Sequence, residues 1–313
     1  MLRVTFLGTG GSIPTTERNP SGVMVEMEGD LLLFDCGEGI QRQMMKHGTG
    51  FGVDAVFLSH IHGDHILGLP GLFQTWTFQG REKPVDIYCP NGMKNVVEDC
   101  ARLGGHSPAY DIRIHEVGNG YSIEMGGYSV EVFRTKHWNV NSVGYSIEED
   151  DRKGRFDRQK AEELGVPPGP LFSKLHEGER VELEDGTTVS PDQVVGEPRP
   201  GRKVVYTGDT RTTDEILEAS RDASLLIHDG MFGDEMSDRA YETGHSTVRE
   251  AAKTARDADV EMLALTHVSS RYSDGVEPLV RQAREIFSHT EIAYDGMQMV
   301  VEYPEKDRET RVV

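Results

Sequence analysis

The residues best suited to chemistry in this sequence form the run His60-Ile61-His62-Gly63-Asp64-His65. This run places four side chains that can bind a metal directly after the apolar segment 54–59. Neutral imidazole is the commonest metal ligand among side chains, and carboxylate oxygen joins it readily around zinc. The alternative is two unrelated surface histidines with Asp64 capping a helix. The density of ligand residues favours a metal site.

Further candidate ligands follow other apolar segments that we expect to be strands. His137 follows the strand expected at 129–135, Asp209 the strand at 203–207, and His267 the strand at 261–266. Ligands collect at the carboxyl ends of strands in open α/β sheets. Taken singly, these three residues could be a loop histidine, a helix cap and a strand-end histidine. Together with the first motif, they predict one shared site.

Seven ligands exceed the needs of a single catalytic zinc, which takes three protein ligands and a water. They suit two metals about 3.5–4 Å apart. We expect Asp209 to bridge the pair, with the other ligands divided into two sets: His60, His62 and His137; and Asp64, His65 and His267. Nitrogen and oxygen donors without thiolate favour two Zn²⁺, with Mn²⁺ or Fe²⁺ as alternatives. We expect Asp35 to orient a ligand histidine, although it could instead be a turn residue.

The elements that must position these ligands alternate between strands and helices. Strands are expected at 2–7, 22–27, 30–35, 53–59, 85–88 and 224–228 in addition to those above. Helices are expected at 40–46, 67–78, 91–103, 214–219, 247–257 and 276–287, with Ser246 or Thr247 capping the fifth. This alternation indicates an α/β protein. Because the first third is richer in strands, we expect two mixed sheets packed face to face, with helices outside.

Composition limits the class of protein. The chain has 313 residues, 36% of them hydrophobic, and lacks an apolar run of membrane-spanning length or a signal segment, so we expect a cytoplasmic globular protein. Its three cysteines, an odd number without a CxxC pair, do not form a disulfide framework. The net charge of −20 argues against a polyanionic partner unless the cytosol is salt-rich, where an acidic surface aids solubility. We favour a halophilic source, which leaves the partner open.

Residues 148–202 interrupt the α/β pattern. This segment is charged, rich in glycine and proline, and poor in long apolar runs. A disordered linker between two domains is one interpretation. The run Pro167-Pro168-Gly169-Pro170 is stiff, however, and aromatic residues surround it. We therefore predict a single domain over 1–313, with 148–202 inserted as a projecting, flexible arm.

The order of ligands resembles that of the metallo-β-lactamase superfamily. Finer motifs resemble the ribonuclease Z branch, the tRNA 3′-endonucleases: Phe6-Leu-Gly-Thr-Gly-Gly-Ser12, Asn19-Pro-Ser-Gly22, Leu33-Phe-Asp-Cys-Gly-Glu-Gly39, Pro167-Pro-Gly-Pro-Leu-Phe172, Tyr206-Thr-Gly-Asp-Thr-Arg211, Gly244-His-Ser-Thr247 and Thr266-His-Val-Ser-Ser-Arg-Tyr272. The likeness extends to about Asp295. It implies an αβ/βα four-layer sandwich, a homodimer with two zinc ions per chain, and precursor tRNA as the partner, with no membrane or DNA partner.

The resemblance also implies roles for individual residues. A metal-bound hydroxide would cut the 3′ trailer from precursor tRNA, leaving a 3′-hydroxyl on the tRNA and a 5′-phosphate on the trailer. Asp64 would handle the proton of the water, and His245 would protonate the leaving 3′-oxygen. The family commonly has a glutamate at the position of Asp229, which would help to place His245. Substrate contacts are expected from the arm and from the end of the last motif: Gly169, Pro170, Lys174, Arg271 and Tyr272. Arg271 and Tyr272 could instead be a surface ion pair and a packed ring.

Two other functions use the same residues. A dinuclear hydrolase of small phosphodiesters or lactones would need the same metal ligands but no arm. A non-catalytic RNA-binding module could keep the fold without the chemistry, although the complete ligand set argues against it. The arm and the His245-Ser246-Thr247 motif favour the nuclease.

Overall fold

Two mixed β-sheets form the centre of the fold in the computed structural model, which describes residues 1–103, 105, 108–303 and 310–313. The first sheet has the strand order β19-β18-β1-β3-β4-β5-β6-β7. Its strands are β1 (Leu2–Gly8), β3 (Gly22–Met27), β4 (Asp30–Phe34), β5 (Ala55–Phe57), β6 (Val85–Pro90), β7 (Ile112–Val117), β18 (Gln298–Val301) and β19 (Arg311–Val312). Strands β4 to β7 pair in parallel, whereas β18, β1, β3 and β4 pair antiparallel.

The second sheet has the order β17-β15-β14-β13-β10-β9-β8. Its strands are β8 (Ser122–Glu124), β9 (Tyr128–Arg134), β10 (Val143–Glu149), β13 (Lys203–Tyr206), β14 (Leu225–Asp229), β15 (Leu263–Thr266) and β17 (Thr290–Ile292). Strands β13, β14, β15 and β17 are parallel, and β10 runs antiparallel to β13. A short parallel pair, β2 (Gly10–Gly11) with β16 (Val268–Ser269), joins the glycine turn to the segment after β15.

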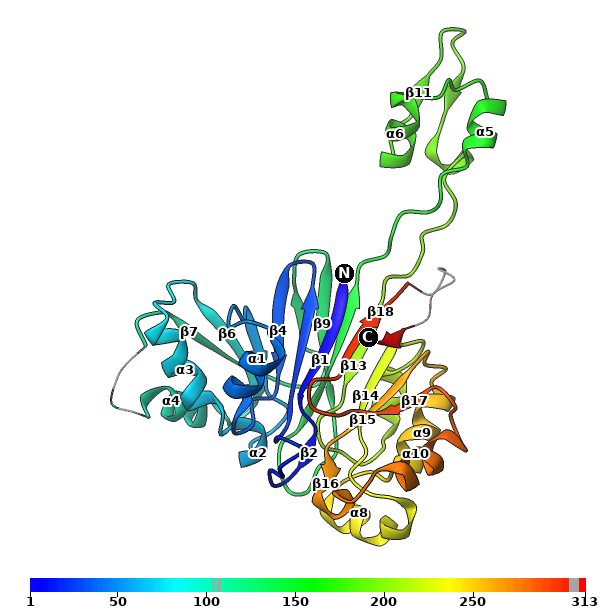
Figure 1. The fold of residues 1–313 in the computed structure, drawn as a ribbon. Helices are drawn as coiled ribbons and strands as arrows, with labels where there is room; N and C mark the ends of the chain where they lie inside the picture. The colour runs from blue at the N-terminus through cyan, green and yellow to red at the C-terminus, as the bar shows by residue number, and fades with distance from the viewer. Residues whose placement is uncertain (104, 106–107, 304–309) are drawn as a thin grey trace. The chain divides into compact units, whose positions relative to one another are not determined.

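Three apolar clusters define four layers. One cluster lies between the sheets and joins Phe34 and Phe57 of the first to Tyr145 and Tyr206 of the second. A second packs the outer face of the first sheet against α1 (Ile40–His47), α3 (Leu69–Phe78) and α4 (Lys94–Arg102). A third packs the other sheet against α7 (Asp214–Ala219), α9 (Val248–Asp257) and α10 (Glu277–Arg284). The expected αβ/βα four-layer sandwich is therefore confirmed (Figure 1).

Outside residues 149–201, the remaining described helices are short: α2 (Gly63–Ile66), α8 (Ser237–Thr243), and the 3-10 turns η2 (Asp234–Met236) and η3 (Ser270–Tyr272). Thr247 caps the N-terminus of helix α9. Its side chain accepts a hydrogen bond from the backbone amide of Glu250, and the Glu250 side chain accepts one from the backbone amide of Thr247, which together form a capping box. The helix expected from Leu67 begins instead at Leu69, because α2 ends first and Gly68 caps α3.

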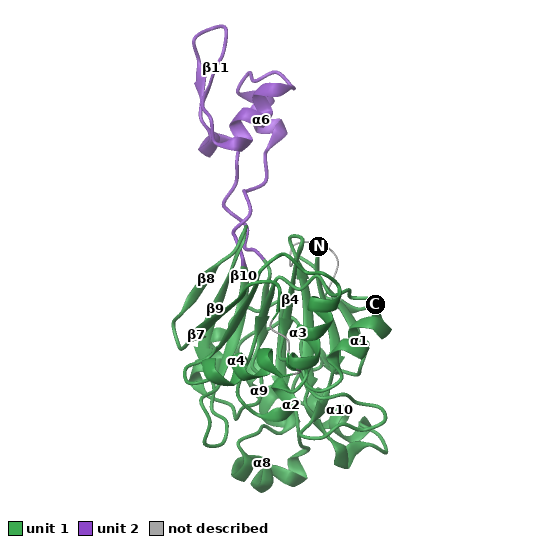
Figure 2. Ribbon diagram, turned by 90° about the vertical axis from the view of Figure 1, so that its left-hand side faces the viewer, with its two compact units in different colours: residues 1–148, 202–313 green, residues 149–201 purple. Residues whose placement is uncertain are grey.

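Residues 149–201 form a separate compact unit (Figure 2). It contains α5 (Arg158–Glu163), α6 (Pro170–Glu177), the strand pair β11 (Val181–Glu182) with β12 (Thr188–Val189), and η1 (Pro191–Gln193). The unit has its own small core around Ala161, Leu175 and Val194, so it is not an unstructured linker. Its two ends are paired by backbone bonds between Arg152 and Arg199, each 2.8 Å long.

No helix among the described residues is long and apolar enough to cross a membrane.

Candidate metal centre and active site

The carboxyl ends of four strands deliver the seven predicted ligands to one place. The segment after β5 carries the histidine motif, with His62 at the N-terminal cap of α2 and His65 inside this helix. His137 follows β9, Asp209 follows β13 and His267 follows β15. The ligands fall into two groups whose donor atoms lie within 4.8 Å of one another: His60, His62 and His137; and Asp64, His65, Asp209 and His267.

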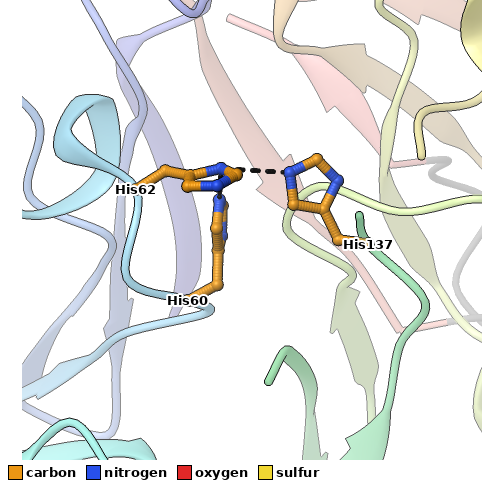
Figure 3. A group of neighbouring side chains, drawn as sticks. All are labelled: His60, His62 and His137. Carbon is orange, nitrogen blue, oxygen red and sulfur yellow. Dashed lines mark hydrogen bonds between the residues drawn. The ribbon is translucent and has the colours of Figure 1, made fainter. Parts of the chain in front are cut away.

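In the first group, three imidazole nitrogens converge (Figure 3). Nδ1 of His62 lies 3.0 Å from Nε2 of His60 and 3.1 Å from Nε2 of His137. One imidazole nitrogen cannot satisfy two such contacts as hydrogen bonds, because it has either one proton or one lone pair. Three nitrogens that point at a common centre are the arrangement expected around a cation.

In the second group, Asp209 is central. Its Oδ2 lies 3.0 Å from Nε2 of His267 and 3.2 Å from Nε2 of His65. Both nitrogens are buried, yet among the described residues neither has a hydrogen-bond partner of good geometry. Oδ2 also lies 3.7 Å from Nε2 of His60 and 3.9 Å from Nε2 of His137, so it faces both groups. The donor set of imidazole nitrogens and carboxylate oxygens suits borderline-soft divalent cations.

The opposite nitrogen of most ligand histidines is held by the protein. Nδ1 of His137 donates to the carbonyl of Gly244 (2.9 Å). Nδ1 of His60 and of His267 contact the hydroxyls of Ser59 (2.9 Å) and Ser21 (3.0 Å). These contacts fix each ring and aim Nε2 at the centre, as outer partners do in metal sites.

Burial and crowding set the protonation of the imidazoles. Burial lowers the pKa of His60, His62 and His267, and neighbouring histidines lower it further, so these rings are neutral and able to bind a metal. Burial would also lower the pKa of His65, but the Asp209 and Asp35 carboxylates outweigh it and raise the value. A cation at Nε2 would displace that proton.

Asp35 occupies the position behind His65. Its side chain is fully buried and accepts from Nδ1 of His65 (2.7 Å), the amide and hydroxyl of Ser59 (both 2.7 Å), and the hydroxyl of Tyr206 (2.6 Å). Asp35 also adopts a left-handed backbone conformation with φ of 56°. Such a conformation is uncommon outside glycine and is retained where surrounding contacts determine it. The carboxylate therefore orients His65 and ties it to both sheets.

Asp64 is held by the glycine turn. The amide of Ser12 donates to its Oδ2 at 2.9 Å, and the same oxygen lies 3.5 Å from Nε2 of His65. The glycine turn can lie this close to His267 only because residue 11 is glycine: a Cβ there would lie 2.7 Å from the carbonyl oxygen of His267. The turn thus contributes a donor that fixes one carboxylate oxygen of Asp64.

His245 lies beside both metal groups. Its ring is 4.7 Å from that of His137 and 5.3 Å from that of His267, centre to centre. Its Nδ1 donates to Oδ2 of Asp229 at 2.8 Å, so the aspartate reaches the histidine despite its short side chain. Burial lowers the pKa of His245, but Asp229 outweighs burial and raises it to about 9. The amides of Thr210 and Met231 hold Asp229 at 3.0 Å each.

The residues expected to contact substrate lie in two places. Gly169, Pro170 and Lys174 are exposed together at the start of α6 in the separate unit, where Gly169 has φ of 146°. Near the metal groups, Arg271 is exposed, but the hydroxyl of Tyr272 accepts from the amide of Gly233 (2.8 Å) and donates to Glu235 (2.6 Å). Tyr272 is thus engaged in packing the loop before α8.

The sequence interpretation gave no individual role to the residues that hold the ligands: Ser12, Ser21, Ser59, Tyr206 and Gly244. Ser59 directly precedes His60, and the other four lie within the motifs quoted for the family resemblance. Each of those four contacts a residue that is remote in sequence, so its spacing alone pointed to no partner.

The comparisons with known proteins agree with this geometry. A family model described as "Beta-lactamase superfamily domain" matches residues 173–268, and one described as "Anti-Pycsar protein Apyc1" matches residues 2–153. The short form of human tRNase Z has a similar solved structure, with a TM-score of 0.70 and 26% identity over 96% of this chain and 99% of that one. The fold and the site define a protein of the metallo-β-lactamase superfamily.

Curated relatives narrow the class further. The chain is 54% identical to "Ribonuclease Z" of Haloferax volcanii, over 98% of this chain and 97% of that protein. It is 55% identical to "Ribonuclease Z" of Halorubrum lacusprofundi, over 98% and 99% of the two chains. The chain belongs to the ribonuclease Z family.

Proposed function

We propose that this protein is a metal-dependent endoribonuclease that removes the 3′ trailer from precursor tRNA. The products would be tRNA with a 3′-hydroxyl and a trailer with a 5′-phosphate. The observation that carries the proposal is the gathering of histidine and aspartate ligands beside His245, in a chain that is similar to ribonuclease Z over its full length.

Two zinc ions are the metals that the donor set suits best, with Mn²⁺ or Fe²⁺ as alternatives. His60, His62 and His137 would hold one ion; Asp64, His65 and His267 would hold the other; and Asp209 would bridge them. A pair of divalent cations supplies an activated water near neutral pH and neutralises charge on the phosphate oxygens.

The chain's own groups handle the protons. Asp64 would orient the attacking water and accept its proton, and the bond from the Ser12 amide to one of its oxygens supports this role. His245 would donate a proton from Nε2 to the ribose 3′-oxygen as the bond to phosphorus breaks, because its Nδ1 is bonded to Asp229. The positive charge on this ring is stabilised by the Asp229 carboxylate, which keeps a proton available.

The main test is cleavage of a precursor tRNA labelled at its end and carrying a 3′ trailer. We expect a cut next to the discriminator base that is lost with a chelator and restored by zinc. A salt series tests the interpretation of the −20 charge as an adaptation to a salt-rich cytosol, since activity should then rise with salt.

Two further measurements, hydrolysis of a small phosphodiester and metal content, separate the alternative functions. Hydrolysis of bis(p-nitrophenyl) phosphate without cleavage of precursor tRNA would favour a hydrolase of small esters. Fewer than two equivalents of metal, with no hydrolysis of either substrate, would favour an RNA-binding module.

The separate unit at 149–201 is our candidate for a second tRNA-binding surface, used in addition to the metal site, through Gly169, Pro170 and Lys174. We expect replacement of residues 153–198 by a short linker, which keeps the bonded pair Arg152 and Arg199, to lower kcat/KM for precursor tRNA by roughly 10²-fold or more. Turnover of bis(p-nitrophenyl) phosphate should stay close to that of the unaltered protein. Equal losses on both substrates would refute a tRNA-binding role for this unit.

Two further expectations accompany the family assignment. A homodimer is testable by sedimentation at several protein concentrations, where a mass that stays at one chain would refute it. The cytoplasm is where we expect the enzyme to meet precursor tRNA.

A further inference from the structure

A large polar cavity opens beside the metal ligand His137. Its volume is about 990 Å³, and it is bordered by the end of β9, the β9–β10 loop and the segment that leads from β13 into α7. The volume is at the upper end of the range of small-molecule sites, about 300–1,000 Å³. The cavity therefore has room for more than one nucleotide next to the reacting phosphate.

Positive charge lines this cavity although the chain is strongly acidic. Arg134, Lys136 and Arg211 all border it. Two carboxylates, Asp214 and Glu215, border it as well, so three cations face two anions. Against a net charge of −20 for the whole chain, this is a local reversal of sign.

The backbone arrangement holds the cations in place. Arg134 and Lys136 are exposed, whereas Thr135 and His137 are buried. Because side chains alternate along an extended chain, the two cationic side chains lie on its exposed side and the candidate metal ligand His137 on its buried side. The amide of Lys136 donates to the Thr210 hydroxyl, and its carbonyl accepts from the Arg211 amide, both at 3.0 Å. The two cationic segments are thus joined directly.

Two aromatic side chains accompany these cations: Tyr241 of α8, which contacts Arg211, and Trp138, which follows Lys136 and His137 in the chain. The guanidinium of Arg211 lies 3.7 Å from the centre of the Tyr241 ring, which keeps this cation extended. Trp138, the residue after His137, is 60% exposed, while its backbone is packed against Gly244 so closely that a Cβ on this glycine would lie 2.5 Å from the Trp138 nitrogen. The indole is therefore exposed on an anchored loop.

We propose that this cavity, which we call the trailer cavity, binds the unpaired 3′ trailer through phosphate contacts from Arg134, Lys136 and Arg211. Trp138, the residue after the lining residue His137, stacks on a trailer base just outside the cavity. The inference rests on the proposed function, since it assigns a part of the same substrate. A cationic channel combined with an aromatic platform is how proteins bind single strands without reading their sequence.

The trailer fits the cavity better than the tRNA side of the cut does. On the tRNA side, one unpaired base precedes the paired acceptor stem. The trailer is unpaired and differs in sequence between transcripts. A lining of Arg, Lys, Asn and Thr side chains suits backbone contacts that tolerate any sequence.

The test compares precursor tRNA carrying a single trailer nucleotide with the same tRNA carrying a long trailer. For Arg134→Gln/Lys136→Gln, we expect the ratio of kcat/KM, long to short, to fall about tenfold relative to the unaltered protein. Trp138→Ala should lower the same ratio to a similar extent, about tenfold. The matched control Lys253→Gln/Arg281→Gln removes two exposed cations from α9 and α10 and should leave the ratio unchanged.

A binding measurement separates this inference from the proposed function. Fluorescence anisotropy of a labelled unpaired oligoribonucleotide needs no cleavage, and the Arg134→Gln/Lys136→Gln protein should bind it about tenfold more weakly. Unaltered binding together with an unaltered ratio would overturn the trailer cavity. An equal loss on both trailer lengths would assign these cations to the tRNA body. Failure of the unaltered protein to cut any precursor would refute the nuclease while leaving the binding result to judge the cavity.

Discussion

His245→Ala should lower kcat for precursor tRNA by roughly 10²–10⁴-fold while the protein keeps its metal. The reason is the leaving group: a ribose 3′-oxygen must be protonated as it departs, and Nε2 of His245 is the group that we propose as the proton donor. Metal content by atomic emission, together with kcat on end-labelled precursor, measures both quantities.

A substrate that needs no acid makes this test specific. The p-nitrophenolate leaving group is stable as an anion, so His245→Ala should hydrolyse bis(p-nitrophenyl) phosphate at a rate near that of the unaltered enzyme. His245 also lies with His137 and Asp209 in a set of residues whose atoms could hold a metal. Loss of metal, or an equal loss of both activities, would assign His245 to metal binding and contradict its role as the acid.

Asp35→Asn should weaken zinc binding by roughly 10–100-fold and lower the free energy of unfolding by about 3 kcal/mol. The buried carboxylate accepts from His65, Ser59 and Tyr206, and an amide would turn a donor toward groups that are themselves donors. Competition with a chelator measures the affinity, and thermal unfolding with and without zinc measures stability.

Asp86→Asn is the matched control for this change. Its carboxylate also lies 2.7 Å from a histidine nitrogen, that of His115, but both side chains are about one-third exposed. An exposed pair contributes about 0–1 kcal/mol, so this change should be nearly silent. Equal effects of the two substitutions would mean that Asp35 has no special role in holding His65.

The sequence was most informative where a motif follows an apolar strand. Strands β5, β13 and β15 and the cap at Thr247 were predictable because apolar runs and capping residues act locally. The prediction omits β7 and β10. In β7, charged residues such as Arg113 and Glu116 interrupt the apolar pattern, and β10 contains Gly144, which lowers strand propensity. Gly144 is needed there because a Cβ would lie 2.2 Å from the Phe133 ring.

The clustering of the candidate ligands and the contact of Asp35 with one of them were predictable from residue type and motif, but most other outer partners were not. His137 is held by a carbonyl 107 residues away, and Tyr206 reaches Asp35 across 171 residues. Such contacts depend on how the two sheets face each other, which is set by packing between them and not by local pattern. The expected contact of Tyr272 with substrate stays a prediction, and its partners Gly233 and Glu235 are visible only in the fold.

The division of ligands between the sheets has a thermodynamic consequence. His60, His62, Asp64 and His65 follow a strand of the first sheet, whereas His137, Asp209 and His267 follow strands of the second. Each metal group draws ligands from both sheets. A bound cation therefore cross-links the two halves of the sandwich, and at a free concentration a thousandfold above its dissociation constant it adds about 4 kcal/mol to the free energy of unfolding. Metal bound here would serve stability as well as the reaction, so the availability of metal in the cell would set both the activity of the enzyme and its free energy of unfolding.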